Sequence, residues 1–200
     1  MNEPVRACFA LGLTLVLASG CASSTGGGAE EPIAAPSQSA QIDVPDGVDL
    51  TGAGARLAIG ERASAIYTVD DQRTSVISVT VDKIVSGSTK RDFKDFSLTA
   101  KSRASTPYYV DAVVRNDGPG ALDKARVPVF GYDSSKAYFP PSDLIGRFDR
   151  CVGGPLPATF EAGDTVKRCL VFLVPAGETL SAVQLRTEDV NAPISWPAPD

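Results

Sequence analysis

The chain has 200 residues, of which 43% are hydrophobic and 22% charged, and its formal net charge is −5. This composition is typical of a globular domain with appendages, and the acidic balance lacks the basic surface that nucleic-acid binding requires. Histidine is absent, which excludes mechanisms that use an imidazole as base, acid or metal ligand, including Ser-His-Asp and Cys-His systems and the usual zinc sites.

Residues 1–20 have the features of a bacterial lipoprotein signal. The apolar run over residues 7–19 has about the length of a signal h-region and is shorter than the roughly 20 apolar residues that span a bilayer. It ends in Leu17-Ala18-Ser19-Gly20-Cys21, which resembles the lipobox read by lipoprotein signal peptidase. We therefore predict cleavage before Cys21 and a lipid on its sulfur. An ordinary secretion signal with a chance cysteine is the alternative.

Residues 21–45 are rich in Ser, Gly, Ala, Pro and Gln and contain almost no large apolar side chain. Such a segment cannot bury enough surface to offset the entropy lost on ordering it. We predict that it is a disordered tether between the lipid on Cys21 and a domain formed by residues 46–200. The expected location of that domain is the extracellular face of the cell membrane.

The rest of the chain consists of short apolar alternations separated by turn residues. Period-two alternation with β-branched residues is typical of half-buried strands. One helical turn is expected over residues 92–96, and Pro128 favours an edge position or a bulge for its strand. No long stretch has a 3.6-residue apolar period, so we predict an all-β antiparallel sandwich of about 7–8 strands. The expected strands cover residues 57–59, 63–69, 76–85, 108–115, 126–132, 137–139, 167–174 and 181–186.

Two cysteines remain for the folded domain. Cys8 is lost with the signal and Cys21 is modified, which leaves Cys151 and Cys169. Two remaining cysteines in an exported domain usually pair, so we predict a structural disulfide between them. Closing this loop of about 19 residues stabilises the fold by roughly 3 kcal/mol on the chain-entropy model. A redox or metal role is the alternative, disfavoured because C-x-x-C spacing and histidine are lacking.

Four segments together resemble a family of actinobacterial secreted lipoproteins within the telokin-like, immunoprotective extracellular immunoglobulin-like domain superfamily. They are YYVDAVVRN at 108–116, VPVFG at 127–131, FEAGD at 160–164 and CLVFLVP at 169–175. The resemblance covers about residues 57–196 and implies an immunoglobulin-like sandwich outside the membrane, without a defined activity. The matched positions are turns and core, so the resemblance implies no functional residues.

Motifs for common chemistries are absent from the sequence, including the Walker A loop, the dinucleotide-binding glycine pattern, the G-x-S-x-G elbow and S-x-x-K with its partner motifs. Carboxylate pairs are the remaining catalytic candidates, although glycosidase-type chemistry needs two acids held across a cleft. Adjacent acids in turns are more often solvated surface. Calcium ligation by Asp70 and Asp71 is a further alternative. The pairs are Asp70 with Asp71, Asp92 with Asp95, and Glu188 with Asp189.

Aromatic residues cluster in the middle of the chain, and such side chains are favoured at protein and sugar contacts. The simpler interpretation places Tyr108 and Phe130 in the core and Tyr109 and Tyr132 at its rim. Trp196 is expected to cap one end of the sandwich, within a carboxyl-terminal segment over residues 193–200 that otherwise frays.

These observations predict a non-enzymatic, membrane-anchored extracellular lipoprotein that serves as a binding or interaction module of the cell envelope. We expect no catalytic residue, no cofactor and no metal site. The expected partners are the membrane, through the lipid on Cys21, and an envelope protein or glycan, but not nucleic acid. The alternative is a small carboxylate-dependent hydrolase or lyase of the cell envelope.

Overall fold

The computed structural model describes residues 42–187, 189 and 191–199. The predicted signal, most of the predicted tether with Cys21, and Glu188 therefore lie outside the described residues. The described residues all belong to one compact unit, Ala40–Asp200. Within them, no helix has both the length and the apolar character needed to cross a membrane.

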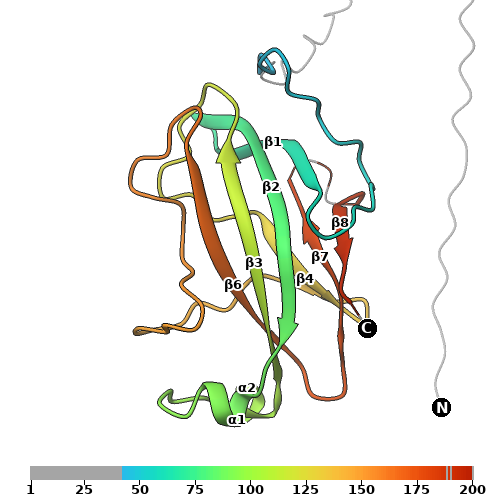
Figure 1. Ribbon diagram of the computed structural model, residues 1–200, viewed down its shortest axis with the longest axis vertical. Helices are drawn as coiled ribbons and strands as arrows, with labels where there is room; N and C mark the ends of the chain where they lie inside the picture. Colours follow the sequence, from blue (N-terminus) through green and yellow to red (C-terminus); the bar gives the residue numbers. More distant parts are fainter. Residues whose placement is uncertain (1–41, 188, 190, 200) are drawn as a thin grey trace, which may run out of the picture. The chain divides into compact units, whose positions relative to one another are not determined.

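Eight strands in the described part of the chain form two antiparallel sheets of four strands each (Figure 1). The first sheet has the order β1-β2-β3-β6 and the second the order β5-β4-β7-β8. Two short helices lie in the connection between β2 and β3, beyond one end of these strands (Figure 1). The predicted all-β antiparallel sandwich is thus confirmed. The elements are β1 (Arg62–Asp70), β2 (Arg73–Ser86), α1 (Thr89–Asp92), α2 (Ala100–Ala104), β3 (Thr106–Asn116), β4 (Val129–Asp133), β5 (Tyr138–Phe139), β6 (Thr165–Val174), β7 (Leu180–Leu185) and β8 (Ile194–Pro197).

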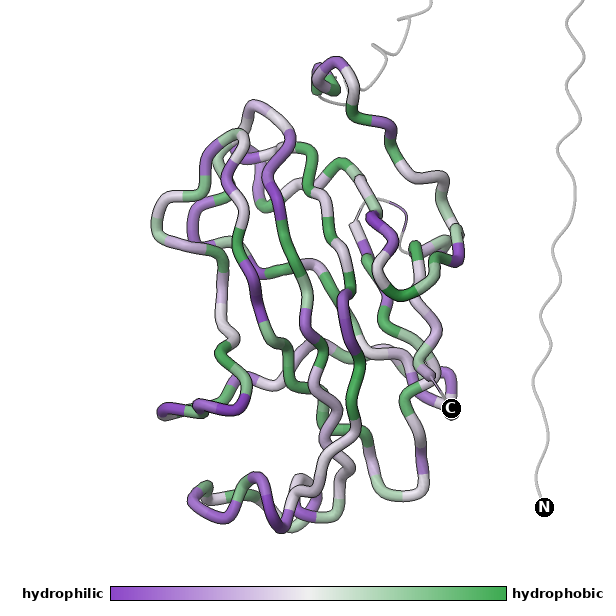
Figure 2. Tube along the Cα trace, viewed as in Figure 1, coloured by the Kyte–Doolittle hydropathy of each residue, from purple (hydrophilic) through white to green (hydrophobic). Residues whose placement is uncertain are grey.

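The main core lies between the two sheets and is built by alternate residues of each strand. Val79 of β2 and Val110 and Val114 of β3 are fully buried there, against residues such as Val183 of β7. Both hydrophobic and hydrophilic residues occur along the strands (Figure 2), because successive side chains of a strand point to opposite faces of the sheet. The period-two alternation expected for residues 108–115 is confirmed, since Val110, Ala112 and Val114 are all buried in the main core.

Loops cover the two open sides of the sandwich. On one side, the main-chain N–H of Thr51 donates to Ser64 in β1 over 2.8 Å, and that of Leu57 donates to Ser195 in β8 over 2.8 Å. On the other side, a loop over residues 140–155 runs along β6, where the N–H of Ser142 donates to the carbonyl of Val171 over 2.7 Å. This second loop shapes the candidate site.

Several predicted elements are corrected by the structure. Residues 57–59 form no strand, and only an isolated bridge at Arg56 lies beside them. The strand predicted from residue 126 begins at Val129, after Pro128, and pairs on both sides, so it is not an edge strand. The ring of Pro128 therefore removes no hydrogen bond from the ladder. The helical turn expected over 92–96 lies earlier, as α1, and α2 was not predicted.

The carboxyl-terminal segment was also predicted wrongly. It does not fray, because β8 pairs with β7, and Ile194 lies opposite Leu185. Trp196 does not cap an end: its side chain is fully buried in the main core, and its indole Nε1 donates to the carbonyl of Glu61 over 3.0 Å. The sequence prediction missed this strand because it has only four residues and lies in an eight-residue segment with three prolines.

Candidate ligand-binding cleft

Cys151 and Cys169 are bonded to each other, with their Cα atoms 5.0 Å apart, which confirms the predicted disulfide. Cys169 belongs to β6 and Cys151 to the loop 140–155, so the bond fastens this loop to the edge of the first sheet. Next to the bond, a Cβ on Gly153 would lie 2.7 Å from the carbonyl oxygen of Cys169. A side chain at position 153 would therefore push the loop away from β6.

A second hydrophobic cluster lies beneath this loop, on the outward face of β3 and β6. Tyr109 is 6% exposed there, and its ring centroid lies 6.0 Å from that of Phe148. Phe148 stacks on Phe93 at 4.9 Å. Tyr109 was predicted at the rim because it points away from the main core. The prediction is wrong because the loop covers this part of the outward face.

Asp92 ties the loop to the connection after β2. Its carboxylate accepts hydrogen bonds from the main-chain N–H of Ser88 at 2.9 Å and from the hydroxyl of Tyr109 at 3.0 Å. The guanidinium of Arg150 lies 3.6 Å from the same carboxylate and 4.5 Å from the centre of the Tyr109 ring. Arg91 adds a contact at 2.9 Å. The Asp92 side chain is only 3% exposed, so these partners replace water around its charge.

These contacts decide the ionisation of Asp92. Burial alone raises its pKa, but the hydrogen bonds from Ser88, Arg91 and Tyr109 and the charge of Arg150 outweigh burial and lower the pKa from 3.8 to about 2. Burial and the bond to Asp92 in turn raise the pKa of the Tyr109 phenol. Asp95, the residue weighed as a catalytic partner of Asp92, is exposed. Asp92 therefore acts as a structural anion and not as one half of an acid–base pair.

The loop borders a cleft of about 1140 Å³. The cleft is lined by much of the loop, by residues 124 and 126–130 before and within β4, by residues 169–171 of β6, and by parts of β1 and of the segment after β7. A volume of this size is ample for a small-molecule ligand, since such sites usually measure about 300–1,000 Å³. The cleft lies beside the connection between β5 and β6, which contains no helix or strand.

The lining combines apolar surface with an excess of positive charge. Phe130, Pro141 and Phe148 are half-buried, and Val152 is 70% exposed. Four cationic and two anionic side chains line the cleft, an excess of two positive charges in a chain of net charge −5. They are Lys124, Arg126, Arg147 and Arg186, with Asp143 and Asp149.

An ion pair joins two of the lining segments. The guanidinium of Arg126 meets the carboxylate of Asp143 through Nη2–Oδ2 at 2.9 Å and Nη1–Oδ1 at 3.4 Å. The two side chains are 72% and 73% exposed. Exposed pairs of this kind contribute about 0–1 kcal/mol to stability. Arg147 and Asp149 form a second pair within the loop, also largely exposed.

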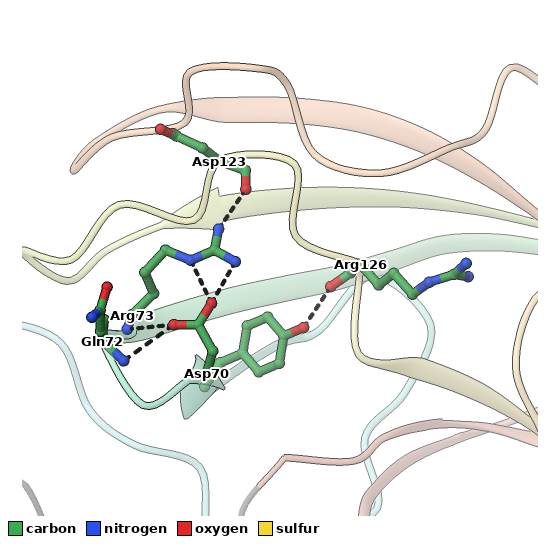
Figure 3. Close-up of polar contacts among 6 residues, drawn as sticks. Asp70, Gln72, Arg73, Asp123 and Arg126 are labelled. Atoms are coloured by element: carbon green, nitrogen blue, oxygen red, sulfur yellow. Dashed lines mark hydrogen bonds and ion pairs between the residues drawn. The ribbon is translucent and has the colours of Figure 1, made fainter.

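β1 and the turn that follows it hold the main chain over residues 123–126 (Figure 3). The guanidinium of Arg73 lies 2.7 Å from the carboxylate of Asp70 and donates from Nη1 to the main-chain oxygen of Asp123 over 2.7 Å. The hydroxyl of Tyr67 donates to the main-chain oxygen of Arg126 over 2.8 Å. The Arg126 side chain is thus presented from a fixed main-chain position while its guanidinium remains exposed.

The described members of the candidate carboxylate pairs lie outside the cleft. Both oxygens of Asp70 accept hydrogen bonds within its own turn, from Arg73 and the main-chain N–H of Gln72, and Asp71 is exposed. Asp189 accepts from the main-chain N–H groups of the turn that follows it, and its partner Glu188 lies outside the described residues. None of the described members of the three pairs lines the cleft. The described residues also contain no group of three or more His, Cys, Asp or Glu side chains placed to hold a metal ion.

Sequence reasoning missed Arg126, Asp143 and the apolar lining around Val152. A usable signal was the length of the connection over residues 140–164, because loops longer than about 12–15 residues without secondary structure are uncommon in compact domains unless they are functional.

Comparisons with known proteins add little to this description. No protein-family model matches the chain, and a search of curated proteins found no match. Among solved structures, the chain is similar to a secreted protein from Mycobacterium tuberculosis, MPT63, with 13% sequence identity, a TM-score of 0.48, and coverage of 74% of this chain and 99% of that chain. A likeness at this level carries no argument about what the chain binds, and lipidation of Cys21 stays a prediction.

Proposed function

We propose that this protein is a non-enzymatic binding module of the cell envelope, tethered through Cys21 to the extracellular face of the membrane, and that its ligand binds in the cleft beside the Cys151–Cys169 disulfide. The observation that carries this proposal is the cleft itself. Its volume of about 1140 Å³ and its mixture of apolar and charged lining are those of a ligand site.

The way the cleft is built supports binding more than catalysis. Its two carboxylates, Asp143 and Asp149, are each paired with an arginine and largely exposed, so neither sits in the desolvated setting that tunes an acid for proton transfer. The disulfide and the Asp92 contacts fix the loop on both the β6 side and the α1 side. A fixed loop lowers the entropy lost when a ligand binds.

The proposal is tested by retention from cell-envelope extract. The mature chain without its lipid-bearing Cys21, starting at residue 22, is exported behind a cleavable signal so that the disulfide forms. It is immobilised, and the retained proteins, glycans and lipids are analysed by mass spectrometry. Val152→Trp fills the mouth of the cleft. Ile145→Trp is the matched control, because Ile145 is 95% exposed on the same loop but does not line the cleft.

We expect the parent chain and Ile145→Trp to retain the same ligand and Val152→Trp to lose it. Two results contradict the proposal: retention of nothing above a blank matrix, or equal retention by Val152→Trp. Both variants should melt at the temperature of the parent, since both positions are solvent-exposed.

A further inference from the structure

We infer that the cleft binds an amphipathic anion, meaning a ligand with an apolar body and one acidic head group, and that the head group takes the place of Asp143 on Arg126. This inference rests on the proposed function and names the chemical class of its ligand. It is carried by the charge of the lining, by its apolar surface, and by the exposed pair that joins two of its segments.

The charge of the lining selects the sign of the ligand. Positive side chains exceed negative ones there, whereas the whole chain is acidic. Lys124 lines the cleft, is exposed, and forms no ion pair with any described residue. A local excess of positive charge attracts anions and repels cations, so this lining favours an anionic ligand.

The apolar part of the lining requires more than a small ion. Phe130, Pro141, Leu144 and Phe148 are partly exposed around the cleft, and Val152 is 70% exposed at its edge. Removing such surface from water is favourable in proportion to its area. An inorganic anion would pair with the cationic side chains but would leave the apolar lining exposed to water. A ligand with an apolar chain or ring system satisfies both.

The pair between Arg126 and Asp143 supplies a position for the acidic group. The two contacts at 2.9 and 3.4 Å show that the guanidinium of Arg126 already meets a carboxylate with both of its terminal nitrogens. A ligand carboxylate or phosphate can form the same two charge-assisted hydrogen bonds. The exchange costs little, because an exposed ion pair is only weakly stabilising and Asp143 returns to water when displaced.

This competition gives opposite expectations for the two partners. Replacing Arg126 removes the group that donates to the acidic head group and should weaken binding. Replacing Asp143 with Asn removes the competitor, leaves Arg126 in place, and should strengthen binding. A purely structural role for the pair would make both substitutions act in the same direction.

The test uses isothermal titration calorimetry on the mature chain from residue 22. The probes are dodecanoate and dodecyl phosphate, each below its critical micelle concentration, with dodecyl maltoside as a neutral ligand of equal chain length. Arg126→Gln is compared with Arg103→Gln, and Asp143→Asn with Asp71→Asn. Each control makes the same charge change at an exposed residue that does not line the cleft.

We expect both anions to bind at least tenfold more tightly than the maltoside, and affinity to fall from the dodecyl to the decyl and octyl chains. Arg126→Gln should weaken binding about tenfold or more, the usual effect of losing a hydrogen bond between charged groups. Asp143→Asn should strengthen it severalfold, while the two control variants stay within twofold of the parent. A preference for one of the two anions assigns the head group as carboxylate or phosphate.

The inference is overturned if affinity is independent of the head group, if Arg126→Gln behaves like Arg103→Gln, or if Asp143→Asn weakens binding. Binding to anionic vesicles without binding of either monomeric anion also overturns it, because that pattern is surface docking and not occupation of a cleft. If no amphiphile binds but envelope extract yields a ligand that Val152→Trp loses, the inference fails and the proposed function stands. If extract yields nothing, the proposed function itself fails.

Discussion

The hydroxyl of Tyr109 donates a hydrogen bond to the carboxylate of Asp92 over 3.0 Å, beneath the loop that the disulfide fastens to β6. Tyr109 lies on the outward face of β3, where a sandwich normally meets water, and Asp92 closes the short helix α1. Their contact joins β3 to α1, and Arg150 of the loop over residues 140–155 lies 3.6 Å from the same carboxylate. The buried carboxylate of Asp92 therefore helps to hold the loop that forms one side of the candidate cleft.

Asp92→Asn should lower the stability of the domain in a pH-dependent way. Because the pKa of Asp92 is lowered in the folded state, from 3.8 to about 2, its stabilising effect is present above about pH 4 and is lost as the pH falls through 2. Urea denaturation between pH 2 and pH 7 should show the variant clearly less stable at pH 7 and close to the parent near pH 2. Asp95→Asn is the control, and an equal effect from it would contradict the role assigned to Asp92.

Loss of the disulfide should lower the melting temperature by about 10 °C, because closing its loop contributes roughly 3 kcal/mol and a domain of this size shifts by several degrees per kcal/mol. The double variant Cys151→Ser with Cys169→Ser tests this by calorimetry. Free-thiol labelling of the native parent should find neither cysteine reactive. Two reactive thiols before reduction would show that the bond is absent from the protein.

Asn116 should be among the most sensitive polar positions in the chain. Its side chain is fully buried, donates from Nδ2 to the carbonyl oxygens of Gly120 and Phe160 at 2.7 and 3.1 Å, and accepts from the Ser75 hydroxyl at 2.7 Å. Asn116→Ala leaves these groups unsatisfied and should cost about 2–4 kcal/mol in the free energy of unfolding. Chemical denaturation measures the loss, and Asn191→Ala, at an exposed position, should change stability by under about 0.5 kcal/mol.

Cys21→Ala should release the protein from the membrane, since the sequence predicts that its lipid is the anchor. The measurement is partition between detergent and aqueous phases after expression of the full gene in a suitable bacterium. Cys8→Ala, within the predicted signal, is the matched control and should partition like the parent. Equal recovery of Cys21→Ala in the detergent phase would place the anchor elsewhere in the chain.

The sequence predicted the features that follow from the local pattern of apolar residues or from excluding other cysteines. Alternation from Tyr108 to Val114 predicted which side of β3 enters the core, and the count of unmodified thiols predicted the bond between Cys151 and Cys169. It did not predict the burial of Tyr109, because the residues that cover it, such as Phe148 and Arg150, follow about forty positions later in a loop without periodicity.

The cleft was missed for the same reason. Arg126 and Asp143 are 17 positions apart, and their pairing depends on how the turn at Arg73 and the hydroxyl of Tyr67 hold the chain before β4. Contacts of this kind come from tertiary packing and leave no mark in the local pattern of apolar and polar residues. The candidate carboxylate pairs were disfavoured from the sequence because adjacent acids in turns are more often solvated, and Asp70 caps its own turn.

The central claim is that ligand binding occurs in the cleft. Hydrogen–deuterium exchange of the mature chain, measured with and without the fraction of envelope extract that it retains, tests this claim most directly. We expect slower exchange over residues 140–155 and 124–130 when ligand is present, with α1, α2 and β8 unchanged. Slower exchange confined to the α1–α2 connection or to β8, with residues 140–155 unaffected, would contradict the claim and place the binding surface on another face of the domain.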